Sequence, residues 1–109
     1  MKLEAAESIG FDNVTAEQLR AAFASDAGWG EFIILSRDRD HYLQAAGETD
    51  GQYTLEYRDG DAAHHFCAGD AFRKEDLLRA FVSYLADSAQ WRSEFNWQKL
   101  ERKPWWKLW

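Results

Sequence analysis

The chain has 109 residues, of which 46% are hydrophobic and 16% aromatic, and its formal net charge is −6. This length fits one domain, and the apolar content suffices for a folded core, which argues against an intrinsically disordered chain. The acidic balance argues against general binding to nucleic-acid phosphates, because such binding depends on surplus Lys and Arg side chains.

Cys67 is the sole cysteine of the sequence, so no intrachain disulfide can form and a reducing compartment is expected. The first residues of the chain lack the continuous apolar stretch of a signal peptide or membrane helix. We therefore expect a cytoplasmic protein.

A first helix is predicted after Val14. Thr15 has the chemistry of an N-cap, and Gln18, three positions on, is its partner in a capping box. Val14 and Leu19 are spaced as a hydrophobic staple. The inward stripe is formed by Leu19, Ala22 and Phe23. The glycines in Ser25–Gly30 are expected to end the helix.

Four short strands joined by polar turns are predicted between Glu31 and Cys67. They are expected at Glu31–Ser36, His41–Ala46, Gln52–Arg58 and Asp61–Cys67. The third alternates apolar and polar residues, as a half-buried strand does, whereas the first is continuously apolar and is expected to be covered on both faces or nearly so. Asp59-Gly60 predicts a hairpin turn with φ > 0 at both residues. Turns this short make neighbouring strands antiparallel, so the predicted sheet is a meander.

A longer amphipathic helix is predicted beyond Gly69, with Asp70 as its N-cap and its end near Asp87. Its apolar face comprises Leu77, Leu78, Phe81, Tyr84 and Leu85. A last extended segment is expected at Glu94–Leu100. The predicted fold class is α+β, an antiparallel β-meander of four to five strands packed against one long and one short helix. Residues 1–103 would form this single domain, followed by a Trp-rich basic tail at 104–109.

Carboxylates occupy the predicted turns, where Asp side chains commonly hydrogen-bond the nearby backbone. Turns that are two apart along a meander lie at the same end of the sheet. Asp38 and Asp40 are therefore expected beside Asp59 and Asp61, forming an acidic rim that could contact a basic partner. The polar face of the third strand would extend this surface with Gln52, Thr54, Glu56 and Arg58.

A metal site or a nucleophilic site at His64, His65 and Cys67 is the alternative from another class of function. On a strand, His65 and Cys67 share one face and His64 points to the other, so one face offers two ligands, whereas a structural zinc site takes four. A Cys67–His65 pair also lacks an identifiable third group to orient the histidine. Ordinary surface histidines beside a buried cysteine are the expected arrangement. We expect no cofactor and no metal.

Five of the six tryptophans lie in the last nineteen residues, among basic side chains. Trp91 and Trp97 are expected to pack in the core. Trp105, Trp106 and Trp109 could fold back over the sheet, contact another chain as in a homodimer, or lie at a membrane interface. The first two arrangements are favoured, because lasting membrane anchorage usually takes two signals and large apolar patches seldom stay exposed.

The order of these features resembles the small bacterial immunity proteins of polymorphic toxin systems, in particular the family paired with deaminase-type toxins. The resemblance covers Val14–Leu100 and is carried by the capped first helix, Tyr42-Leu43-Gln44, Gly51–Gly60, the amphipathic helix and a closing Trp91 followed by Phe95-Asn96-Trp97. It lies in pattern and element order rather than in a diagnostic motif.

This resemblance implies a non-enzymatic inhibitor that binds a toxin encoded beside it, with no catalytic residues to transfer. An acidic body would speed the encounter with a basic toxin domain. Two alternatives stay open at this point. One is a small enzyme or metal-binding protein using His65 and Cys67, and the other is an assembly or membrane-surface module using the tail.

Overall fold

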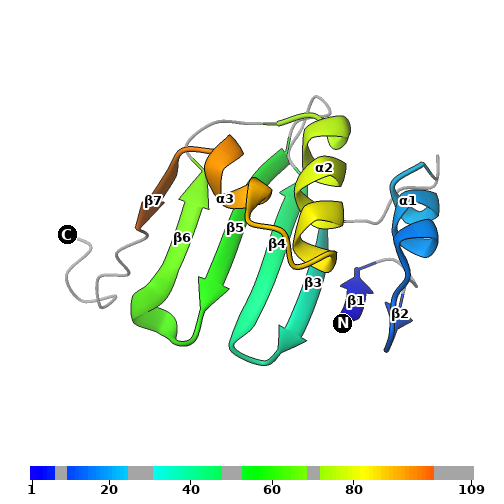
Figure 1. Cartoon of the computed structure of the whole chain (residues 1–109), viewed down its shortest axis with the longest axis horizontal. Helices are drawn as coiled ribbons and strands as arrows, with labels where there is room; N and C mark the ends of the chain where they lie inside the picture. Colours follow the sequence, from blue (N-terminus) through cyan, green and yellow to red (C-terminus); the bar gives the residue numbers. More distant parts are fainter. Residues whose placement is uncertain (7–9, 25–30, 48–52, 69–71, 100–109) are drawn as a thin grey trace.

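The computed structural model describes residues 1–6, 10–24, 31–47, 53–68 and 72–99. Its seven strands form one antiparallel sheet in the order β2-β1-β3-β4-β5-β6-β7, with helices over one face (Figure 1). The strands are β1 (Lys2–Ala5), β2 (Gly10–Phe11), β3 (Phe32–Asp38), β4 (His41–Gly47), β5 (Tyr53–Asp59), β6 (His65–Ala68) and β7 (Trp97–Lys99). The helices are α1 (Ala16–Ala24), α2 (Lys74–Leu85) and α3 (Gln90–Glu94). The predicted α+β class is confirmed, although the sheet has more strands than the four to five predicted.

The hydrophobic core lies between the helices and one face of the sheet. The strand registers place Leu35, Leu43 and Tyr57 side by side on β3, β4 and β5. A second row on the same face consists of Ile33, Ala45 and Leu55, all fully buried. Leu77 and Phe81 of α2 are also fully buried in this cluster, so the long helix covers the sheet as predicted.

The capping box predicted at the start of α1 is confirmed. The backbone N–H of Gln18 donates to Thr15 Oγ1 at 3.1 Å, and the backbone N–H of Thr15 donates to Gln18 Oε1 at 3.0 Å. The ring of Phe23 meets the ring of Phe81 edge-on at 5.2 Å, which fixes α1 against α2. Ser25–Gly30, where the helix was expected to end, lies outside the described residues.

Strands β1 and β2 are absent from the predicted set. β1 pairs with β3 from Lys2↔Ser36 to Ala5↔Ile33, and β2 adds to the outer side of β1. Leu3 is the one large apolar side chain of β1, and it is fully buried. A four-residue strand with one such residue has too little local pattern to be recognised, because its stability comes from pairing with a distant strand.

The apolar strand β3, expected to be covered on both faces or nearly so, is fully buried on one face and half-buried on the other. Its residues alternate between buried and half-buried positions, with Ile33 and Leu35 facing the core. Phe32 and Ile34 face the other side, and no described helix lies over that side of the sheet (Figure 1). One face of an antiparallel sheet can stand in contact with solvent or a partner.

The turn that follows β5 differs from the prediction. Asp59 ends the strand in extended conformation, and Gly60 alone adopts a positive φ, of 103°. Asp61–His64 is not part of a strand, because Ala62–His64 forms a 3₁₀ turn and β6 begins only at His65.

The side chain of Asp61 explains this turn. Its carboxylate accepts hydrogen bonds from the backbone N–H groups of Ala63 at 2.9 Å and His64 at 3.1 Å. Such local side-chain bonds offer the backbone an alternative to strand pairing. Here the turn held by Asp61 forms in place of the predicted first part of the strand.

Helix α2 begins at Lys74 with Arg73 as its N-cap, whereas the predicted cap, Asp70, lies outside the described residues. The Asp76 carboxylate accepts from the backbone N–H of Arg73 at 3.2 Å. Glu75 and Asp76 both occupy the first turn, where negative charge stabilises a helix. Within the predicted extended segment Glu94–Leu100, Trp97–Lys99 forms β7, but Glu94 belongs to α3.

Trp91 and Trp97 pack into the core as predicted. The ring of Tyr57 lies 4.9 Å from that of Trp91 and 4.7 Å from that of Trp97, both edge-on. The indole N–H of Trp97 donates to the backbone carbonyl of Trp91 at 3.4 Å. Edge-to-face rings of this kind add stability beyond their buried area. The tail tryptophans Trp105, Trp106 and Trp109 lie outside the described residues.

Among the described helices, none combines the length and the apolar character needed to span a bilayer.

We expect Leu43→Ala to lower the free energy of unfolding by about 3 kcal/mol, because it leaves a cavity in the middle of the fully buried face. Gln44→Ala is the matched control, since Gln44 points to the opposite face, and it should cost less than about 1 kcal/mol. Urea unfolding followed by circular dichroism measures both. A Leu43→Ala protein as stable as the Gln44→Ala protein would contradict the packing described above.

Candidate functional site at one end of the sheet

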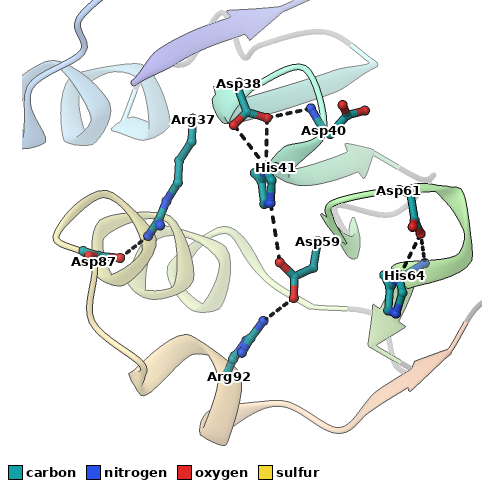
Figure 2. Close-up of polar contacts among 9 residues, drawn as sticks. All are labelled: Arg37, Asp38, Asp40, His41, Asp59, Asp61, His64, Asp87 and Arg92. Carbon is teal, nitrogen blue, oxygen red and sulfur yellow. Dashed lines mark hydrogen bonds and ion pairs between the residues drawn. The ribbon is translucent and has the colours of Figure 1, made fainter.

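Charged side chains gather where β3, β4 and β5 meet the connection between α2 and α3 (Figure 2). His41 and Asp59 each lie two residues from a core residue, Leu43 and Tyr57 respectively, and so project on the helix side of the sheet. The β3–β4 register shifts between Ser36 and Asp38, and the residue within this irregularity is Arg37. Irregularities of this kind re-aim a side chain, and that of Arg37 reaches Asp87 beyond α2.

His41 links three elements of this site. Its Nδ1 lies 2.9 Å and 3.1 Å from the two carboxylate oxygens of Asp38, and its Nε2 lies 3.8 Å from Asp59 Oδ1. Arg92 of α3 donates to Asp59 Oδ2 at 3.0 Å. An ionised carboxylate can only accept, so the ring proton of neutral His41 is on Nδ1. The series Asp38–His41–Asp59–Arg92 thus joins the β3–β4 turn, β5 and α3.

Two rim carboxylates have lowered pKa values. The hydrogen bond from His41 is the main cause that lowers the pKa of Asp38, followed by the bond from the backbone N–H of Asp40. The hydrogen bond from His64 is the main cause that lowers the pKa of Asp61. Both carboxyl groups are therefore ionised throughout the physiological pH range.

The connection between α2 and α3 holds Asp87 in place. Asp87 has a φ of 58°, its N–H donates to the carbonyl of Tyr84 at 3.1 Å, and the N–H of Ser88 donates to the carbonyl of Ser83 at 3.0 Å. This is a Schellman motif, whose left-handed position is usually glycine and sometimes a short polar residue. The carboxylate that stands there instead pairs with Arg37. The helix end therefore presents a charge where its backbone would prefer glycine.

A cleft of about 230 Å³ lies within this cluster, and its aromatic walls are Tyr57, Tyr84 and Trp91. The guanidinium of Arg37 lies over the ring of Tyr84 at 5.2 Å. The guanidinium of Arg92 lies 5.5 Å from the ring of Tyr57 and 5.4 Å from that of Trp91. Burial raises the pKa of Tyr84 to about 12, so its phenol stays protonated and neutral. The cleft is suited to binding through ion pairs, hydrogen bonds and ring stacking.

The predicted rim residues come together in part. Asp38, Asp40 and Asp59 lie at one end of the sheet, with the Gly60 N–H donating to the Asp40 carbonyl at 2.9 Å. Asp61 follows in the next turn. Sequence reasoning did not find that the rim is paired within the chain. Asp40 lies 3.4 Å from Arg58, Asp59 pairs with Arg92, and Asp61 lies 2.8 Å from His64.

The predicted surface residues Thr54, Glu56 and Arg58 lie on the sheet face away from the helices, alternating with the core residues of β5. Gln52 lies outside the described residues. Across the strands, Ile34, Gln44, Glu56 and Cys67 form one row of this face, and Ser36, Tyr42, Arg58 and His65 form the next.

The expectation that His65 is an ordinary surface histidine is wrong. It is only 4% exposed, its Nε2 lies 2.9 Å from Glu56 Oε1, and the ring of Tyr42 stands at 6.1 Å. Cys67, expected to be buried, is half-buried, and His64 lies in the exposed 3₁₀ turn. In the part of the chain that the structure describes, no group of three or more His, Cys, Asp or Glu is placed to hold a metal ion.

Comparison of the chain with protein-family models, with curated proteins and with solved structures gave no match. The functional argument therefore depends on two features of the chain itself. These are the charged cleft at the end of the sheet and the sheet face over which no helix of the described residues lies, called the helix-free face below.

Two substitutions at Asp87 separate its backbone role from its charge. Asp87→Gly and Asp87→Ala both remove the pair with Arg37, but alanine also carries a Cβ into the left-handed region. We expect the alanine variant to be less stable than the glycine variant by about 1 kcal/mol. Guanidinium chloride unfolding measures the difference, and equal stabilities would contradict the Schellman geometry.

His41→Ala should raise the pKa of Asp38 toward its ordinary value, because the main cause of the lowering is then absent. The control is His64→Ala, which should raise the pKa of Asp61 instead and leave Asp38 unchanged. Carboxyl ¹³C NMR titration measures both values. Because the folded-state pKa of Asp38 is lowered, its stabilising effect is present above the unfolded-state pKa and is lost as the pH falls through the folded-state value.

Proposed function

We propose that the protein is a non-enzymatic, cytoplasmic protein-binding module of the immunity type, which inhibits a basic toxin domain encoded beside it. Its binding surface would be the helix-free face of the sheet together with the rim carboxylates. The observation that carries the proposal is the composition of this face, and the resemblance in element order to immunity proteins supports it.

The helix-free face has the character of an interface rather than of an ordinary solvated surface. Phe32, Ile34 and Tyr42 are half-buried apolar side chains on the adjacent strands β3 and β4. Arg58 extends the face on β5, and the four strands β3 to β6 contain no lysine. Interface cores are enriched in aromatic residues and Arg and depleted in Lys. This composition favours a protein partner.

The rim supplies charge for a basic partner. The whole chain carries −6, and the side chains of Asp38 and Asp61 are more than half exposed. Their pairs with histidines of the same chain are exposed and therefore weak, so a partner's cations could compete for these carboxylates. Charge of this kind speeds encounter and sets orientation more than it adds affinity.

The test uses the protein encoded by the adjacent gene, purified and titrated by calorimetry. We expect binding at micromolar concentration or tighter. Gln44→Arg places a long charged side chain on the helix-free face and should weaken binding at least tenfold. Ala21→Arg adds the same charge on the exposed side of α1, away from both surfaces, and as the matched control it should change affinity less than twofold. Absence of binding, or equal effects of the two variants, would overturn the proposed surface.

A further inference from the structure

We propose that the cleft beside Asp87 is a binding site for an arginine side chain of the protein partner. The inference rests on the proposed function, because the partner supplies the arginine. It adds a specific site at the helix side of the rim, next to the proposed sheet surface, and a specific chemical group for that site.

Charged groups of both signs line the cleft. Its arginines are Arg37, Arg58 and Arg92, and its carboxylates are Asp59 and Asp87. Asp38 and Asp40 add two carboxylates at the rim, where they pair with His41 and Arg58. Each arginine of the cleft already has a carboxylate partner, so a ligand cation enters by exchange with one of these arginines.

The carboxylate of Asp87 is the most available charged group of the cleft. Its side chain is 76% exposed and pairs with Arg37 through Oδ1, whereas the Arg37 side chain is 41% exposed and lies over the Tyr84 ring. The Schellman bonds hold the backbone at Asp87, so its side chain always starts from this end of α2. Asp87 therefore offers an accessible acceptor beside the cleft.

The protein already shows how a guanidinium binds here. Arg37 lies over the ring of Tyr84 and pairs with Asp87, and Arg92 lies over the rings of Tyr57 and Trp91 and pairs with Asp59. Twice in one cleft, a guanidinium stacks on an aromatic wall and meets a carboxylate. Planar guanidinium suits both contacts better than an ammonium group does.

We therefore infer that the partner's arginine takes the place of Arg37, stacking on Tyr84 and pairing with Asp87. The exchange is feasible because an exposed pair such as Arg37–Asp87 is weak. The cleft volume of about 230 Å³ is below the roughly 300–1,000 Å³ of sites for drug-sized ligands, which fits one side chain rather than a larger molecule.

The experiment uses the full chain and three small probes: methylguanidinium, ethylammonium and acetate. Binding is followed by amide and indole N–H shifts in ¹H–¹⁵N NMR. We expect methylguanidinium to shift the indole of Trp91 and the amides of Asp87–Arg92, with ethylammonium weaker at the same signals. Acetate binding in the cleft with no response to methylguanidinium would overturn the inference, as would the absence of any shift there.

Two matched pairs of variants test the exchange. Arg37→Ala removes the competing guanidinium and should tighten methylguanidinium binding about two- to fivefold. Arg39→Ala changes the net charge equally in the exposed β3–β4 turn and should have a much smaller effect. Asp87→Asn should weaken binding at least fivefold, whereas Glu17→Gln on α1 should not. Equal effects of the two variants in either pair would show that binding depends on net charge alone, and would overturn the proposed arginine site.

The probes separate this inference from the proposed function. If the neighbouring-gene protein binds and Gln44→Arg weakens that binding, but methylguanidinium leaves the cleft signals unchanged, the arginine site fails and the proposed function stands. If methylguanidinium binds as expected but that protein does not bind, the proposed function fails, and the partner's arginine fails with it.

Discussion

The rest of the structure depends on the antiparallel register that aligns Leu35, Leu43 and Tyr57 in one buried row under the helices. Side chains alternate between sheet faces with a period of two, so this row also decides where the polar residues project. His41 and Asp59 must then lie on the helix side, at the end where α2 and α3 meet. A one-residue slip of β4 would expose Leu43 and move His41 to the opposite face. Burial of the core residues thus fixes the strand register, and the register fixes where the side chains of the cleft lie.

Structural features that depend on a few neighbouring residues could be predicted from the sequence, whereas contacts between distant residues could not. The capping box at Thr15 lies within three residues, and its bonds are as expected. The β1–β3 pairing and the Arg37–Asp87 contact join residues far apart in the chain. At Asp61 the error had another cause, because the alternation pattern does not reveal that a carboxylate caps a turn. Topology correctly placed Asp38, Asp40 and Asp59 at one end of the sheet, but their partners Arg58 and Arg92 become visible only in three dimensions.

The helix-free face also differs from an ordinary solvated surface, because it contains a buried polar pair. His65 is buried there and contacts Glu56 at 2.9 Å, in a row with Tyr42 and Arg58. Burying polar groups is costly unless they are hydrogen-bonded, so this pair requires a well-ordered surrounding surface. A fixed surface loses less conformational entropy on binding than a mobile one. This order suits a face that recognises one partner, as in the proposed function.

The two proposed surfaces share a border at the rim. Arg58 projects on the helix-free face and pairs with Asp40, whose backbone N–H donates to Asp38, and Asp38 contacts His41 of the cleft wall. A standard interface covers roughly 800 Å² on each partner, which is enough for one protein to span an edge of the sheet and contact both sides of it. The contiguous contacts do not by themselves make the two surfaces energetically coupled. They do place the charges so that a single basic domain could lie on the sheet face and extend one arginine around its end into the cleft.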